Sequence, residues 1–152
     1  MYKVIYTFIA VFLISNTVTV YASSSSRSTK DILQEIADNA EVANGSTEVK
    51  EYNAKTLDVS KELSNDLKVA QKHWDGCGPF KTTTYRRDSI RALEEYSHDQ
   101  KVIDALMHLY QEKKISKSYS ISTNHNVECS QIWVEIFTTD GYRLSLWYGL
   151  GD

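Results

Sequence analysis

Apolar side chains near the amino-terminal end of the chain recur at helical spacing. Ile32, Ile36 and Ala40 lie one helical turn apart, with mostly polar residues between them. Ser28 precedes this stripe and offers a side-chain oxygen that can accept a hydrogen bond from the first turn. The pattern therefore predicts a helix that begins after Ser28 and ends near Val42.

A longer helical pattern follows over residues 46–73. Its apolar positions recur at steps of three and four residues, which places them on one face of a helix. Gly76, Gly78 and Pro79 end this helix, because glycine and proline are poor helix formers. The positions that define the stripe are Val49, Tyr52, Thr56, Val59, Leu63, Leu67, Ala70 and Trp74.

The middle of the chain combines a short β pattern with further helical spacing. Residues 81–85, Lys-Thr-Thr-Thr-Tyr, are rich in β-branched side chains and predict a short strand. Residues 88–113 return to helical spacing and predict either one kinked helix or two separate helices.

From Ile115 onward the apolar period changes to two. Residues 115–123, 127–138 and 142–149 are rich in alternating and β-branched side chains, so each predicts a strand. Asp140-Gly141 lies between the last two segments and is a favoured two-residue hairpin turn. The end of the chain therefore predicts a three-stranded antiparallel meander.

Helices followed by such a sheet define one α+β domain over residues 29–152. We expect amino-terminal helices packed on a curved antiparallel meander of three to four strands. This arrangement is similar to the cystatin-like and NTF2-like architectures. The likeness is one of architecture alone, and folds of this kind host many functions.

The turn at Asp140-Gly141 decides which residues face each other across the last hairpin. A two-residue turn places Trp133 opposite Tyr148 and Val134 opposite Trp147. One face of the hairpin is then expected to pack on the helices. That face carries Cys129, Trp133, Phe137, Tyr142, Leu144, Leu146 and Tyr148.

The other face of the hairpin is also apolar, although a sheet face exposed to water should be polar. Either the amino-terminal helix covers this face, or the face is an exposed patch that binds a partner. Tryptophan and arginine are enriched in protein interfaces, which favours the second reading at two of these positions. The candidate partner-binding residues are Trp147, Arg143, Ile132, Val134 and Ile136.

The first 22 residues have the pattern of an export signal. A short basic start precedes an apolar run from Val4 to Ile14, and Ala22 is suited to signal-peptidase cleavage. We expect residues 1–22 to be removed and residues 23–28 to form a flexible serine-rich leader. The mature protein is then periplasmic or secreted. An uncleaved anchor is the alternative, although the apolar run is short for a membrane span.

The chain is mildly acidic. Its formal net charge is −3 at pH 7, and removal of residues 1–22 takes away Lys3 and no acid. The basic cluster Arg86, Arg87 and Arg91 is flanked by acids and fits a solvated helix start. The charge argues against a nucleic-acid partner, which usually selects a basic face, and suits a basic protein partner.

Cys77 and Cys129 are the two cysteines of the chain. Export and an even cysteine count favour a disulfide between them, which closes a loop of roughly 50 residues and stabilises by about 4 kcal/mol. The alternative is a hydrolase with Cys77 as nucleophile and a histidine as base. Cys77 follows a helix end, however, and so lacks the helix amino terminus that lowers a thiol pKa.

Other combinations of chemically active residues are too sparse to define a site. Asp104 and His108 lie one helical turn apart, which is too few ligands for a zinc pattern. Glu94, Glu95 and Asp75 offer carboxylates for glycoside chemistry, but the sequence does not give their separation. We therefore expect no metal and no cofactor.

These observations favour a binding protein over an enzyme. The leading hypothesis is an exported protein that inhibits or neutralises a protein partner, as a toxin-immunity protein or an enzyme inhibitor does. The second hypothesis is a secreted effector or small hydrolase that uses Cys77 or a carboxylate. The third is a component of an envelope secretion or conjugation assembly.

Overall fold

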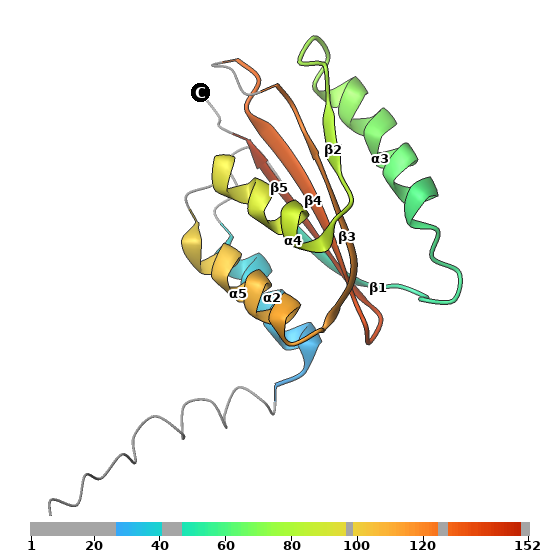
Figure 1. Cartoon of the computed structure of the whole chain (residues 1–152), viewed down its shortest axis with the longest axis vertical. Helices are drawn as coiled ribbons and strands as arrows, with labels where there is room; N and C mark the ends of the chain where they lie inside the picture. Colours follow the sequence, from blue (N-terminus) through green and yellow to red (C-terminus); the bar gives the residue numbers. More distant parts are fainter. Residues whose placement is uncertain (1–26, 41–46, 97–98, 125–127, 150–152) are drawn as a thin grey trace, which may run out of the picture.

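The computed structural model describes residues 27–40, 47–96, 99–124 and 128–149 (Figure 1). The predicted export signal lies outside these residues. The helices are α2 (Thr29–Asn39), α3 (Val59–His73), α4 (Arg86–Arg91), the short 3-10 helix η1 (Ala92–Glu95) and α5 (Gln100–Gln111). The strands are β1 (Thr47–Glu51), β2 (Lys81–Thr83), β3 (Ile115–Ser122), β4 (Gln131–Thr138) and β5 (Tyr142–Gly149).

The described strands form one antiparallel sheet of five strands in the order β1-β5-β4-β3-β2. Helices lie on both of its faces: α2, α4 and α5 on one side and α3 on the other (Figure 1). The predicted α+β class is confirmed, and the sheet has more strands than the three to four expected.

Each face of the sheet has its own apolar core. Val134 and Leu146 are fully buried on the face covered by α2, α4 and α5. Tyr119 and Phe137 are fully buried on the face covered by α3. Both faces of the last hairpin are apolar because helices cover both of them, so neither face is a wide exposed patch.

The predicted helix over residues 46–73 is half wrong, because its first part is a strand. Thr47 and Val49 are half-buried and alternate with exposed neighbours, and β1 pairs along β5. Helix α3 begins only after Asp58, whose side chain accepts a hydrogen bond from the Lys61 backbone N–H at 3.1 Å. The apolar positions of residues 47–51 fit both a helix and a strand. Pairing with β5 satisfies the backbone hydrogen bonds of this segment, so contact with a distant strand decides that it is a strand.

The hairpin between β4 and β5 has a three-residue loop, Thr139 to Gly141, and not the expected two-residue turn. Gly141 has a φ of +95°, a conformation that glycine adopts readily and that fits a three-residue loop. The Thr138 hydroxyl accepts from the Tyr142 backbone N–H at 3.0 Å and lies 2.7 Å from an Asp140 carboxylate oxygen. These bonds hold the longer loop.

The extra loop residue changes every pair across the hairpin. Trp133 lies opposite Trp147 rather than Tyr148, and Ile132 lies opposite Tyr148. A slip of one residue exchanges the faces of one strand relative to the other. The expected grouping of Trp133 and Phe137 with Leu144, Leu146 and Tyr148 is therefore wrong.

The remaining elements follow the sequence patterns closely. The short strand expected over residues 81–85 is present as β2. Of the two alternatives for residues 88–113, separate helices are present and not one kinked helix: α4 begins slightly earlier, at Arg86, and is followed by η1 and α5. Ser28 caps α2 by accepting from the Asp31 backbone N–H at 3.2 Å, as predicted. Strand β4 begins at Gln131, a few residues later than expected.

Candidate partner-binding site

Three of the five predicted contact residues belong to the core. Ile132, Val134 and Ile136 are 0% exposed and pack among the side chains of α2, α4 and α5. A buried side chain offers no surface to a partner, so assigning these three residues to an exposed patch is wrong. The helices α2, α4 and α5 bury this face, and the longer hairpin loop places Trp147 and Arg143 on the other face.

Trp147 lies on the opposite face of the sheet, in an aromatic cluster at the end of α3. Its ring is parallel to that of Trp133, with centroids 5.4 Å apart, and meets Trp74 edge-on at 5.1 Å. The His73 ring lies 5.6 Å away. Trp147 is half-buried, and these contacts give it a packing role between the sheet and α3.

Arg143 lies on the same face as Trp147 and joins the sheet to α3. Its guanidinium donates to Glu135 at 2.7 Å, to Glu62 at 3.1 Å and to Asp66 at 3.3 Å. It also lies 5.3 Å from the centre of the Phe137 ring. All of these contacts are internal, so the side chain is held within the fold.

Glu135 is the buried centre of this charged cluster. Its carboxylate is 0% exposed and also accepts from Trp133 Nε1 and from the Ser145 hydroxyl, each at 2.7 Å. Burial raises the pKa of Glu135, and the hydrogen bond and charge of Arg143 act against that rise. Burial acts to lower the pKa of Arg143, but the hydrogen bond and charge of Glu135, together with the charges of Tyr119 and Asp66, raise it overall.

Asp66 makes part of the cluster sensitive to pH. Burial raises the pKa of Asp66 above 3.8, although the Tyr119 hydrogen bond and the Arg143 charge lower it. The folded chain therefore keeps this proton to higher pH than the unfolded chain does. It follows that the contribution of Asp66 to stability falls as the pH rises from 3.8 through the raised pKa.

We expect Asp66→Asn to remove this pH dependence. As the pH rises from 3.8 through the raised pKa of Asp66, the free energy of unfolding of the wild type should fall relative to that of Asp66→Asn. A difference in stability that is the same at every pH does not affect this comparison. Urea unfolding at a series of pH values from 3.5 to 7 measures the difference. Parallel curves for the two proteins would mean that the Asp66 proton is held equally in both states.

A disulfide joins Cys77 to Cys129, as predicted. The bridge links the segment after α3 to the segment before β4, with the two Cα atoms 5.4 Å apart. Neither cysteine is free. The alternative in which Cys77 acts as a nucleophile is therefore wrong for the oxidised protein.

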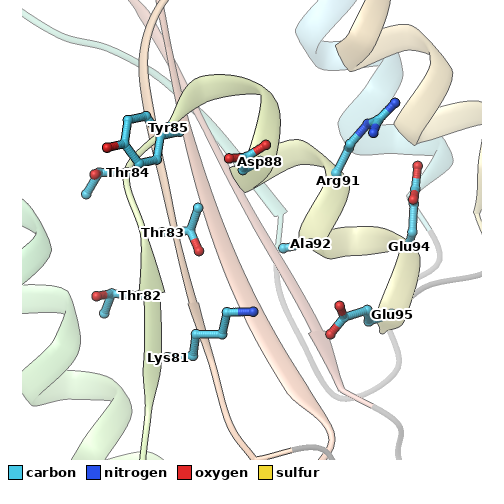
Figure 2. Close-up of a pocket in the computed structure, with 10 residues that line it drawn as sticks. All are labelled: Lys81, Thr82, Thr83, Thr84, Tyr85, Asp88, Arg91, Ala92, Glu94 and Glu95. Carbon is cyan, nitrogen blue, oxygen red and sulfur yellow. The ribbon is translucent and has the colours of Figure 1, made fainter.

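A groove of about 540 Å³ lies beside β2, between this strand and the α4–η1 segment (Figure 2). Among the described strands β2 pairs only with β3, so no further strand covers its outer edge. The Thr83 carbonyl also accepts a hydrogen bond from the Ser89 hydroxyl at 3.1 Å. Lys81 and Thr83 point toward α4 and η1, whereas Thr82 and Thr84 point the other way (Figure 2). The groove is lined by Lys81, Thr82, Thr83, Thr84, Tyr85, Asp88, Arg91, Ala92, Glu94 and Glu95.

Five exposed charged side chains line this groove, namely Lys81, Asp88, Arg91, Glu94 and Glu95. None of them forms an ion pair with another described residue. Acidic groups outnumber basic ones by three to two. The groove thus offers free charges with an acidic excess to a bound molecule.

Tyr85 stands at one end of the groove and is 75% exposed. Val69 on α3, at 41%, is the other large apolar residue exposed within the described part of the chain. An exposed tyrosine beside a groove is typical of an interface anchor, because it buries a large ring at a small entropic cost. We define Tyr85 and the residues of the groove as the β2-edge site.

Sequence reasoning missed the β2-edge site, although two signals pointed to it. Residues 81–85 contain no aliphatic side chain apart from the threonine methyl groups, which is typical of an exposed edge strand rather than a central one. Tyr85 also stands next to Arg86 and Arg87, away from every apolar stripe. Of the carboxylates considered for catalysis, Glu94 and Glu95 line the groove, and Asp75 does not.

Comparison with known proteins gives no indication of function, so the fold and the β2-edge site are the basis for assigning one. A scan against protein-family models found no match, and searches of curated proteins and of solved structures returned none either. In the described residues, no helix has the length and apolar character needed to cross a membrane. Nor do these residues contain a group of three or more metal-binding side chains placed to hold an ion.

Proposed function

We propose that this chain is an exported binding protein that inhibits or neutralises a protein partner. The observation that carries the proposal is the exposed Tyr85 beside an open groove at a free sheet edge. The disulfide supports a periplasmic or secreted location, because such bonds persist in oxidising compartments. The acidic excess of the chain and of the groove suits a basic partner.

Capture of partners with the exported, disulfide-bonded chain tests this proposal. Extracts of its own host and of neighbouring strains supply candidates, and the activity of each captured protein is then measured with and without the chain. We expect one exported toxin or lytic enzyme to bind and to lose activity. Capture of envelope-assembly subunits with no loss of any activity would instead favour the assembly role.

Replacing Tyr85 with alanine should weaken binding to the captured partner by about 2 kcal/mol, or roughly thirtyfold. The reason is the loss of the most exposed aromatic side chain at the site. Val69→Ala is the matched control, because it trims the other large exposed apolar residue, on α3. Equal binding by the two variants would remove Tyr85 from the interface, and titration calorimetry measures both.

A further inference from the structure

We propose that the partner adds an extended segment to the free edge of β2, as a sixth strand of the five-stranded sheet. This inference rests on the proposed function and states how the β2-edge site takes its partner. Lys81 and Thr82 are exposed, and Thr83 is half-buried. A free strand edge presents unpaired backbone N–H and C=O groups, which is the template for strand addition.

The position of the groove fits a strand added at this edge. Side chains of an extended segment alternate between the two faces of the sheet. Those on the side to which Lys81 and Thr83 point would enter the groove beside α4 and η1 (Figure 2). Every second side chain of the added segment would therefore meet the groove.

The charges of the groove indicate which side chains of the added segment would enter it. Asp88, Glu94 and Glu95 have no ion-pair partner among the described residues, and they outnumber the two basic residues of the groove. A segment with lysine or arginine at alternate positions would complement them. The inferred partner segment is extended, rich in β-branched residues and basic at every second position.

The opposite edge of the sheet is less suited to strand addition. Strand β1 exposes Glu48, Lys50 and Glu51, and Lys50 already pairs with Glu48 at 2.7 Å. Charged side chains along an edge disfavour the approach of another strand. Strand β2 instead carries two threonines and one lysine.

A capped peptide that alternates threonine and lysine is the probe for this inference. Three or four backbone hydrogen bonds should give weak binding, with a Kd on the order of 1 mM. We expect the peptide to shift the NMR amide signals of Lys81 to Tyr85 in the exported, oxidised chain. A peptide of the same composition with contiguous lysines should bind several-fold more weakly.

Two N-methylated peptides separate strand addition from simple charge attraction. Successive N–H groups of an extended chain point to opposite edges, so methyl groups on alternate amides block one edge only. One of the two methylation patterns should abolish binding and the other should leave it unchanged. Equal binding of both peptides, or shifts that avoid β2, would overturn the inference.

A charge variant tests the groove itself. Glu94→Gln/Glu95→Gln should weaken peptide binding by roughly fivefold, since each exposed charge pair contributes little. Glu48→Gln/Glu51→Gln changes the net charge equally at the far edge of the sheet and should leave binding unchanged. Equal weakening by both variants would mean a non-specific charge effect and would count against the groove.

The two proposals can fail separately. A captured partner that needs Tyr85, together with equal binding of both methylated peptides, would keep the binding function and reject strand addition. The expected methylation pattern, together with no inhibited partner, would keep strand addition and reject the inhibitory function.

Discussion

Replacing Arg143 with alanine is expected to lower the free energy of unfolding by about 3–5 kcal/mol, the usual cost of removing one partner of a buried ion pair. The loss is large because Glu135 is 0% exposed and Arg143 is its cationic partner. Arg143 also holds Glu62 and Asp66, so its removal releases the charged contacts between the sheet and α3.

Urea unfolding of Arg143→Ala and Arg87→Ala, monitored by tryptophan fluorescence, measures this loss of stability. Arg87 is exposed and forms no ion pair with a described residue, so its replacement should change stability by less than about 0.5 kcal/mol. Similar small losses in both variants would mean that Arg143 is not held in the fold. Arg143 would then become a candidate contact residue again.

The second large effect is expected from removal of the disulfide. Cys77→Ala/Cys129→Ala should lower the free energy of unfolding by about 4 kcal/mol, because the bridge closes a loop with a sequence separation of 52. Without the bridge the unfolded chain gains freedom, and the carboxy-terminal end of α3 loses its covalent link to the sheet. The aromatic cluster around Trp74 and Trp147 depends on that end of the helix.

Guanidinium unfolding of the oxidised wild type, the reduced wild type and the double variant measures this effect. Reduction should reproduce the loss seen in the variant, which separates the bridge from the volume lost with the two sulfur atoms. Thiol titration of the native protein should detect no free thiol. Two free thiols, or equal stability in all three samples, would contradict a structural bridge.

Much of the secondary structure is predictable from the sequence because long periodic segments carry a strong signal. Residues 29–39, 100–111 and 115–122 have the expected type and position. Strand β1 is the exception, because Thr47 to Glu51 fits both a helical stripe and an alternating strand. Pairing with β5, far away in the sequence, decides between the two.

The candidate site was less predictable, for two physical reasons. The hairpin loop is one residue longer than expected, with Gly141 at a positive φ, and this longer loop puts Ile132 on the face opposite Trp147. Periodicity also shows that both sheet faces are apolar without showing what covers them. The β2-edge site depends on the order of the strands in the sheet and on the position of α4. The spacing of apolar residues along the chain predicts neither of them.

The most direct test of the central claim is amide hydrogen exchange of the oxidised chain with and without its captured partner. The claim is that a protein partner contacts the β2-edge site. We expect the amides of Lys81 to Tyr85 to exchange at least roughly tenfold more slowly in the complex. Unchanged exchange at these residues, with protection elsewhere on the surface, would contradict the claim.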